Sequence, residues 1–386
     1  MTGVEGIAWA SWSPDAAAAP WTVGVEEEVM LVSPQTWLPV SRCEDVLAAL
    51  PEDLATCARA ETHGSALELA TAPHVTVGAA TAQLADLRAG LVDTLDELGL
   101  RAAVAGTHPT ARWEDVEVSP GARYQFVHAS MRELARREPT FGLHVHVAVP
   151  DPESALRALN ALRVHMPILL AMSGNSPFWQ GRDSGLASSR TPAFQAFPRT
   201  GTARRFDSYA EYVEAIDVLV RCDAIPEPTF MWWDARLQPA FGTVEVRVMD
   251  AQTRVADTAA LAALVQCLVR LEAERAEPPR SAGDADEVVA ENRFIALRDG
   301  MRASLIDPPR RVRVVERLAA LVEECEPVAR ALGCSGELAR VAALAEWPGA
   351  ERQRAFAARR GLDGVVESLS LEFLSERQLS SYPPAR

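Results

Sequence analysis

Apolar and polar residues alternate with a period of two in the stretch WTVGVEEEVMLV, residues 21–32. This period is typical of a β-strand, whose successive side chains point to opposite faces. Glu26 and Glu28 would therefore share one face, while Glu27 would lie on the other face with the valines. Two carboxylates about 7 Å apart on a buried face repel each other and lose hydration, so they require a cation or a base beside them. A solvent-exposed edge strand is the simpler alternative for this stretch alone.

Three further stretches combine an apolar strand face with polar residues at the same spacing. In FGLHVHVAV the polar pair is His144 and His146, in GTVEVRVMD it is Glu245 and Arg247, and in ALELA it is the single residue Glu68. We therefore predict one sheet with an apolar face packed against helices and an opposite face that collects acids, imidazoles and an arginine. Such a face is typical of a metal or catalytic site rather than of an ordinary solvent-exposed surface.

Helical periodicity dominates the segments between and after these strands. Apolar residues recur at helical spacing over residues 77–98, with Thr76 as the capping residue. A second helix is expected over residues 151–174, kinked at Pro167, and a third over residues 257–274. Strands interleaved with long helices, then helices alone, indicate an α+β fold whose mostly antiparallel sheet is covered on one face.

The domain organisation follows from the same pattern. Residues 1–20, where four alanines lie between two prolines, are expected to form a loose leader. We expect residues 21–386 to form a single domain, which is the catalytic domain if the acidic face is an active site. Its sheet would occupy about residues 21–275, and its last third, about residues 284–386, would be wholly helical.

One long segment, residues 175–208, shows no clear periodicity. It is rich in Ser, Gly, Pro, Arg and aromatic residues, and a loop of this length points to function or to disorder. Asn175 and Arg190 are the candidate ligand-binding residues in it.

Composition narrows the function. The chain has 386 residues, of which 48% are hydrophobic, as expected for a soluble globular protein. Its net charge of −15 argues against nucleic acid or an anionic membrane as a partner. Every basic residue is arginine, which excludes Schiff-base chemistry on lysine and the common lysine-containing phosphate loop.

Cysteine spacing and hydropathy suggest a compartment. The six cysteines show no paired short spacing, so neither a zinc cluster nor a redox pair is expected. No long uninterrupted apolar run is present, and we expect no membrane span and a cytoplasmic protein. A homo-oligomer remains open.

The polar face suits a particular metal chemistry. A site with many carboxylates and one histidine favours Mg²⁺ or Mn²⁺ over zinc, and Glu26, Glu28, Glu68 and Glu245 would supply the carboxylates. Such ions commonly bridge nucleotide phosphates, and Arg247 on the same face could stabilise a transferring phosphoryl group. These residues therefore suggest ATP chemistry without a phosphate loop.

Two other interpretations of the polar face stay open. A His-x-His pair on a strand is also a familiar zinc or binuclear-metal arrangement, so a metal-dependent amide hydrolase competes with the ATP-dependent interpretation. His144 and His146 could equally be core histidines whose ring nitrogens are satisfied.

Several short segments of the sequence together resemble a known protein family. Segments 24–28, 67–71, 106–109, 142–147, 188–190, 233–236 and 241–250 resemble, in order, the carboxylate-amine ligases of the glutamate-cysteine ligase type 2 family. The resemblance covers roughly residues 21–300. It implies a glutamine-synthetase-like fold, in which a curved, mostly antiparallel sheet forms a funnel and ATP, metal ions and amino acid meet on its concave face.

The resemblance also implies a reaction and roles for residues. The γ-carboxylate of glutamate would be phosphorylated by ATP, and the amino group of cysteine would displace phosphate to give γ-glutamylcysteine. Arg247 would contact the transferring phosphate, and Arg190, Arg236 and Tyr124 fall in matching motifs as further catalytic or substrate-binding candidates. Carried over by motif, the implied metal ligands are Glu26, Glu28, Glu68, His144 and Glu245.

This sequence departs from the family pattern at one place. Members carry an acid seven positions before the Glu68 equivalent, which Glu61 can supply, and another four before it, which here is Gly64 beside His63. We expect this loss to affect metal occupancy or the acceptor pocket. A ligase with another amine acceptor and a family member that binds without turnover therefore stay open beside γ-glutamylcysteine synthesis and the hydrolase.

Overall fold

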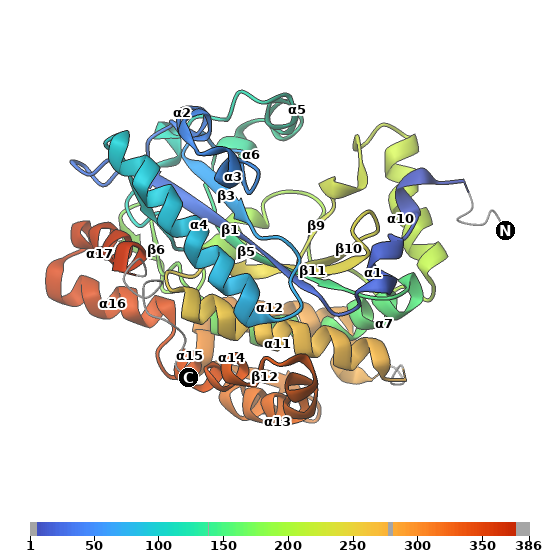
Figure 1. Ribbon diagram of the computed structural model, residues 1–386. Helices are drawn as coiled ribbons and strands as arrows, with labels where there is room; N and C mark the ends of the chain where they lie inside the picture. Colours follow the sequence, from blue (N-terminus) through green and yellow to red (C-terminus); the bar gives the residue numbers. More distant parts are fainter. Residues whose placement is uncertain (1–5, 138, 277–280, 376–386) are drawn as a thin grey trace.

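A seven-stranded sheet runs through the centre of the molecule (Figure 1). The computed structural model describes residues 6–137, 139–276 and 281–375. The strand order is β10-β11-β5-β1-β3-β2, with β4 paired to β1, and every pair in this sheet is antiparallel. The strands are β1 (Val23–Val32), β2 (Ala58–Ala60), β3 (Ala66–Ala70), β4 (Arg101–Ala103), β5 (Gly142–Ala148), β10 (Ala235–Gln238) and β11 (Thr243–Asp250).

The strand register brings the polar positions of the sequence together. Glu26 of β1 lies opposite His144 of β5, and Glu28 lies opposite Glu68 of β3. On the other side of β5, His146 lies opposite Glu245 of β11. Because opposite residues of a sheet share a face, the predicted polar face is confirmed.

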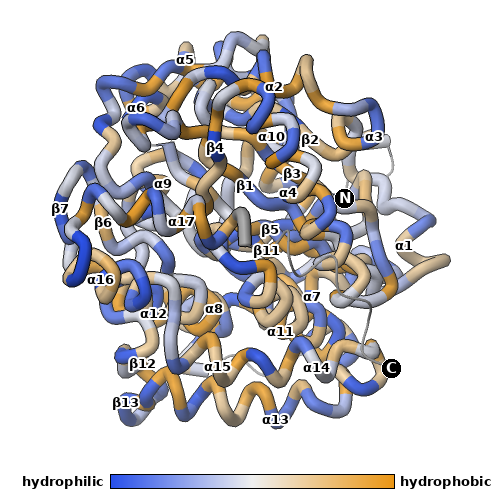
Figure 2. Tube along the Cα trace, turned by 60° about the vertical axis from the view of Figure 1, so that its left-hand side comes forward, coloured by the Kyte–Doolittle hydropathy of each residue, from blue (hydrophilic) through white to orange (hydrophobic). Residues whose placement is uncertain are grey.

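Helices cover the other face of the sheet. The helices α4 (Val77–Glu97), α7 (Pro152–Leu162) and α11 (Val255–Glu274) pack on the strands and on one another. The strand residues that face them, such as Val25, Val145 and Val246, are fully buried. Figure 2 shows the hydrophobic colour along α11 and along α8 (Met166–Ser173), which contacts β11, as expected for helices inside the core. Thr76 caps α4, as predicted, by accepting a hydrogen bond from the Ala79 N–H.

Where one kinked helix was expected over residues 151–174, the structure has two. Asp151 caps α7 as predicted, but α7 ends at Leu162 and α8 begins at Met166 after a turn. Pro167 lies in the first turn of α8, where its missing N–H costs nothing. The proline therefore starts a new helix instead of bending a continuous one.

The prediction of a loose leader is wrong for its described part, residues 6–20. A 3-10 turn (Ala8–Ala10) and the helix α1 (Pro14–Ala18) form there, and Ala10 and Ala16 are buried. The Trp12 indole N–H donates to the Val149 carbonyl at 2.8 Å, which ties the segment to the end of β5. Alanine-rich composition concealed these contacts, because they are made with distant parts of the chain.

Residues 284–375 are mainly helical, with one hairpin among the helices. Strands β12 (Ser304–Asp307) and β13 (Arg310–Arg313) pair there, so the prediction of a wholly helical segment was wrong in this detail. Its helices are α12 (Asp286–Asp299), α13 (Val314–Leu332), α14 (Ser335–Ala339), α15 (Val341–Glu346), α16 (Gly349–Arg360) and α17 (Asp363–Ser375). Helices α13, α14 and α15 contact α11, which puts them outside the layer that covers the sheet.

Short elements complete the described chain. The helices are α2 (Cys43–Ala49), α3 (Glu52–Ala55), α5 (Ala122–Met131), α6 (Glu133–Arg136), α9 (Arg190–Phe194) and α10 (Tyr209–Arg221). The strand pairs are β6 (Phe178–Trp179) with β7 (Arg182–Asp183) and β8 (Thr200–Gly201) with β9 (Trp232–Trp233). Within the described ranges, no helix combines the length and the apolar character needed to cross a bilayer.

Candidate active site

The polar face of the sheet forms the floor of a cavity of about 400 Å³. Strands β1, β3, β5, β10 and β11 supply the floor, and the first residues of α5, the helix α9 and the segment before β9 supply walls. Every predicted site residue except Asn175 lines this cavity: Glu26, Glu28, Glu61, Glu68, Tyr124, His144, Arg190, Arg236, Glu245 and Arg247.

Three groups of acidic and imidazole side chains lie in the cavity. Within each group, one ligand atom per residue lies within 4.8 Å of the others. Glu26 and Glu68 each belong to two groups, so the three groups form one continuous cluster along the sheet. The groups are Glu26, Glu68 and His144; Glu26, His146 and Glu245; and Glu28, Glu61 and Glu68.

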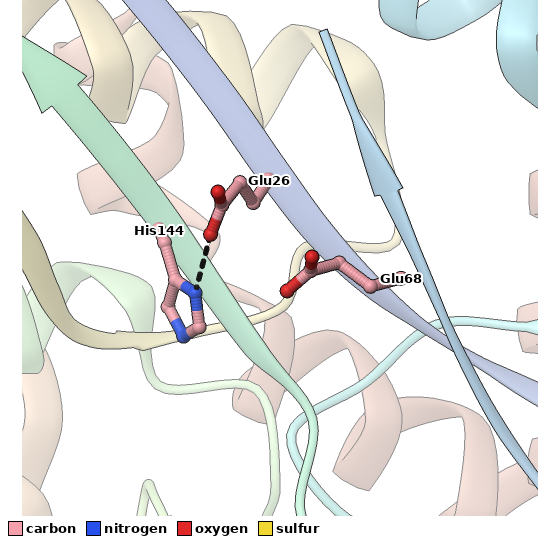
Figure 3. Close-up of side chains that lie close together, drawn as sticks. All are labelled: Glu26, Glu68 and His144. Atoms are coloured by element: carbon pink, nitrogen blue, oxygen red, sulfur yellow. Dashed lines mark hydrogen bonds and ion pairs between the residues drawn. The ribbon is translucent and has the colours of Figure 1, made fainter. Parts of the chain in front are cut away.

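The central group comes from three adjacent strands. In Figure 3, Glu26 of β1 lies between His144 of β5 and Glu68 of β3, and all three side chains point to the same side of the sheet. The Nδ1 atom of His144 lies 3.2 Å from Glu26 Oε2. The Nε2 atom of His144 is buried without a hydrogen-bond partner in the structure, 3.8 Å from Glu28 Oε1.

His146 is a candidate ligand that the sequence prediction missed. Its Nε2 atom lies 3.4 Å from Glu26 Oε1 and 3.9 Å from Glu245 Oε1, while Nδ1 contacts the Thr243 hydroxyl at 3.1 Å. The alternation in the sequence already put His146 on the same face as His144. We expected a single histidine ligand, and the signal that was missing was the register of β5 against β11.

Burial and nearby like charges disfavour the ionised form of several of these carboxylates when no cation is bound. Burial and the nearby charge of Glu61 raise the pKa of Glu28 to about 8. Burial raises the pKa of Glu61, and burial together with the charge of Glu26 raises the pKa of Glu68 well above its usual value. A divalent cation among these oxygens would favour their ionised form, since it replaces repulsion by attraction.

The donors present fit a hard divalent cation. Carboxylate oxygens dominate the cluster, which suits Mg²⁺ or Mn²⁺. Burial and the nearby charge of Arg247 lower the pKa of His144 to about 4, so this imidazole is neutral at pH 7, as a metal ligand must be. The Nε2 atom of His144, which has no hydrogen-bond partner in the described part of the chain, is a polar atom that such a cation would satisfy. For His146, burial lowers the pKa but the charges of Glu26 and Glu245 outweigh it and raise this pKa.

Arginines occupy the β10 and β11 side of the cavity. Arg236 donates to both carboxylate oxygens of Glu245, at 2.7 and 3.1 Å, and Arg247 also donates to Glu245. Burial raises the pKa of Glu245, but the charges of Arg236 and Arg247 outweigh it and hold this pKa well below its usual value. Glu245 is therefore an anion already balanced by two arginines.

Arg190 is held at the cavity wall by hydrogen bonds from its side chain and its backbone. Its guanidinium donates to the Arg247 and Val248 carbonyls at 3.2 and 3.4 Å, and its Nε is buried without a partner in the structure. Its backbone N–H donates to the Ser176 hydroxyl, which in turn donates to the buried carboxylate of Asp250. The guanidinium keeps donor capacity for a ligand.

Asn175, which we predicted as a ligand-binding residue, does not line the cavity. Its buried amide donates to the Ala251 carbonyl at 2.8 Å and accepts a hydrogen bond from Gln353 of α16 at 2.9 Å. Its backbone N–H donates to Asp250 at 2.8 Å. The irregular segment around it is built for these internal contacts, so its role here is to fix Asp250 beside Ser176.

The departure at Gly64 does not remove a donor from the three groups. Gly64 does not line the cavity, and a Cβ atom at this position would lie 3.1 Å from the Ser41 Cβ. The expected effect on metal occupancy is therefore not supported by this geometry. Neighbouring His63 does line the cavity but contacts the Ala135 carbonyl at 2.9 Å, and burial lowers its pKa to about 4.

Comparison with solved structures first defines the class of fold. The chain matches a glutamate–cysteine ligase from Francisella tularensis in complex with AMP with a TM-score of 0.69 at 14% identity, covering 94% of this chain and 90% of that one. It matches a bifunctional glutathione synthetase from Pasteurella multocida with a TM-score of 0.66 at 13% identity, covering 93% of this chain and 52% of that one. The predicted α+β fold class is thereby confirmed.

Sequence comparison then defines the family. Residues 22–372 match the model of the glutamate–cysteine ligase family 2. Two Rubrobacter xylanophilus proteins are similar over most of their length: "Putative glutamate--cysteine ligase 2-1", 41% identical over 337 residues (86% of this chain, 89% of that one), and "Putative glutamate--cysteine ligase 2-3", 43% identical over 362 residues (92% and 97%). The chain belongs to the glutamate–cysteine ligase family 2.

Proposed function

We propose that this chain is an ATP-dependent ligase that joins the γ-carboxylate of glutamate to an amine, with cysteine as the first acceptor to test. The observation that supports it is the cluster of acids and imidazoles beside Arg190 and Arg247 in one cavity. Family membership and the AMP complex of a protein with the same fold add support.

The chemistry has two steps. A γ-carboxylate oxygen of glutamate attacks the γ-phosphorus of ATP, the bond from that phosphorus to the bridging oxygen breaks, and ADP leaves. The amine nitrogen then attacks the carbonyl carbon of the acyl phosphate, the carbon–oxygen bond to phosphate breaks, and a proton passes from the nitrogen to a cavity carboxylate or to water. Arg247 and Arg190 line the cavity and would hold the phosphoryl oxygens, on which negative charge is concentrated.

Mg²⁺ or Mn²⁺ bound by the three groups would supply neutralisation of the phosphate charge and alignment of the phosphates. The chain itself positions the reacting groups and excludes water. Glu245 orients Arg247 through their ion pair, and the buried floor of β1, β3 and β5 restricts water around the reacting atoms.

The direct test is phosphate release from ATP by purified protein with Mg²⁺, glutamate and a panel of amines, with products identified by mass. Cysteine-dependent release with a γ-glutamyl dipeptide would establish the ligase and its acceptor together. Glu68→Gln should lower turnover at least about 100-fold, since it removes a carboxylate ligand of the cation that would neutralise the phosphate charge. Its neutral side chain mimics the protonated Glu68 that burial favours, so folding should be preserved.

The matched control is Glu326→Gln, which changes an exposed carboxylate on α13 and should leave turnover unchanged. Amide cleavage or product formation without ATP would replace the ligase by a metal-dependent hydrolase. No phosphate release with any amine would refute catalysis and leave a binding protein.

A further inference from the structure

The end of the cavity beside β2 carries two arginines that the proposed reaction does not use. Arg59 lies on β2 and Arg123 lies on α5, and both line the cavity. The lining also includes the aromatic residues Phe194, Trp232 and Phe241. The cavity therefore offers both charged and apolar contacts to a ligand.

Arg59 points into the cavity because of its register. It lies opposite Glu68 in the β2–β3 pair, so the two side chains share the polar face of the sheet. Arg59 is exposed, and within residues 6–137, 139–276 and 281–375 its guanidinium makes no hydrogen bond or ion pair. Its charge is available to a ligand.

Arg123 lines the same end of the cavity, from the start of α5. Its guanidinium donates to Glu227 and lies over the Phe230 ring, 4.4 Å from the ring centroid. The next residue, Tyr124, donates its hydroxyl hydrogen to the carbonyl of Ala60, the residue that follows Arg59. This hydrogen bond joins the start of α5 to β2, so both arginines belong to one wall.

Arg190, Arg236 and Arg247 are instead held against β11. Arg236 and Arg247 are paired with Glu245, and Arg190 donates to backbone carbonyls. An anionic group that reaches the β2 end would therefore meet Arg59 as its counter-charge. The adjacent acids Glu61 and Glu68 disfavour a highly charged polyphosphate there, whereas a single carboxylate matches the planar fork of one guanidinium.

We propose that Arg59, flanked by Arg123, binds the α-carboxylate of an amino-acid substrate. This subsite makes the protein select amino acids over amines or acids that lack that carboxylate. The inference rests on the proposed function and deepens it. Two substrates carry such a group, the glutamate donor and the acceptor, and the experiment separates them.

The test uses two pairs of compounds that differ by one carboxylate. L-Cysteine is compared with 2-aminoethanethiol as acceptor, and glutamate is compared with 4-aminobutanoate as donor. Wild-type protein should show kcat/KM at least about 10-fold higher for the member with the α-carboxylate, since hydrogen bonds to charged groups are strong. Arg59→Gln should abolish this preference in one pair and leave it in the other, which identifies the substrate bound.

Two further variants control the result. Arg59→Lys keeps the charge but not the fork and should retain part of the preference. Arg340→Gln replaces another exposed arginine, which lies between α14 and α15 and whose side chain makes no hydrogen bond or ion pair within the described ranges, and should leave both preferences intact. Unchanged preferences in Arg59→Gln would overturn the proposal.

Calorimetric binding of the same four compounds keeps this test independent of turnover. Tighter binding of the carboxylate-bearing members by wild type, lost in Arg59→Gln, supports the subsite even if no ATP is cleaved, in which case only the proposed function fails. Equal affinity of wild type for both members of each pair overturns the subsite, whatever the turnover.

Discussion

Three consecutive glutamates have two different roles in this protein. Glu26 and Glu28 face the cavity, whereas Glu27 is fully buried on the opposite face. Arg88 of α4 donates to both oxygens of Glu27 at 2.8 and 2.6 Å and also to the carbonyls of Gln252 and Thr253. The pleat of one strand thus separates two acids that line the cavity from an acid that anchors a helix.

Arg88→Leu should destabilise the protein by about 3–5 kcal/mol, because it leaves the Glu27 charge buried without a partner. The double variant Glu27→Leu/Arg88→Leu should recover part of this loss, since both charges are then absent. Urea unfolding followed by circular dichroism measures the free energies. A double variant less stable than Arg88→Leu would contradict the argument.

His108 gives a pH-dependent prediction. It is 2% exposed, its Nε2 contacts the Trp37 carbonyl at 2.8 Å, and its Nδ1 accepts hydrogen bonds from the Thr110 and Ala111 N–H groups. Protonation at Nδ1 would break these two contacts. Burial lowers the pKa of His108 from 6.5 to about 4.

As pH falls below 6.5, the unfolded chain takes up this proton first, so the folded protein loses up to about 1.4 kcal/mol of stability per pH unit until about pH 4. Above pH 6.5, His108 contributes no pH dependence. His108→Gln should reduce the slope of unfolding free energy against pH between 6.5 and 4. Equal slopes for wild type and variant would refute this assignment.

The sequence could predict those site residues whose placement depends on local alternation. Glu26, Glu28 and Glu245 followed from a period of two. Asn175 was misjudged because its partners, such as Gln353, lie far along the chain. Arg59 was missed because only pairing with β3 shows which way a three-residue strand faces.

At the scale of elements, long periodic segments were predictable and contact-dependent ones were not. Helices α4 and α11 follow directly from apolar spacing. Helix α1 does not, because it is fixed by packing near the β10–β11 turn. Gly242 in this turn has a φ of +66°, and a Cβ atom there would lie 2.3 Å from the Ala16 Cβ.

Gly242→Ala should therefore cost more than the strain of a positive φ alone. Gly181→Ala is a matched control, because Gly181 has a φ of +77° and open space around its Cβ position. Both variants should lose about 1–2 kcal/mol from backbone strain, and Gly242→Ala about 1–3 kcal/mol more from overpacking against α1. Thermal and urea unfolding measure both, and equal losses would show that α1 gives way freely.

At the scale of the whole molecule, the cavity joins an acidic half to a basic half. Strands β1 and β3 and the residues after β2 bring four glutamates, while β10 and β11 bring arginines. Burial, together with the charges of neighbouring acids, raises the pKa of three of those glutamates, and a cation bound there would favour their ionised forms. Metal content should consequently control stability.

Mg²⁺ should raise the melting temperature of chelator-treated protein. When the Mg²⁺ concentration is 100-fold above Kd, the free energy of unfolding should increase by about 2.7 kcal/mol. The double variant Glu28→Gln/Glu68→Gln should melt higher than wild type without metal, since like charges are removed, and should respond little to Mg²⁺. Differential scanning calorimetry with and without chelator tests both statements. If Mg²⁺ leaves the melting temperature of the wild type unchanged, the cluster is not a metal site.

The strand order also has a consequence for biosynthesis. Strands β1, β2 and β3 are neighbours in the sheet and leave the ribosome first, whereas β11 with Glu245 and Arg247 follows much later. A nascent chain therefore carries the acidic half of the cavity before any of the arginines that β10 and β11 supply. Arg59 of β2, which lies opposite Glu68, is made together with these acids. The ion pairs of Glu245 with Arg236 and Arg247, in contrast, can form only after β10 and β11 have been made.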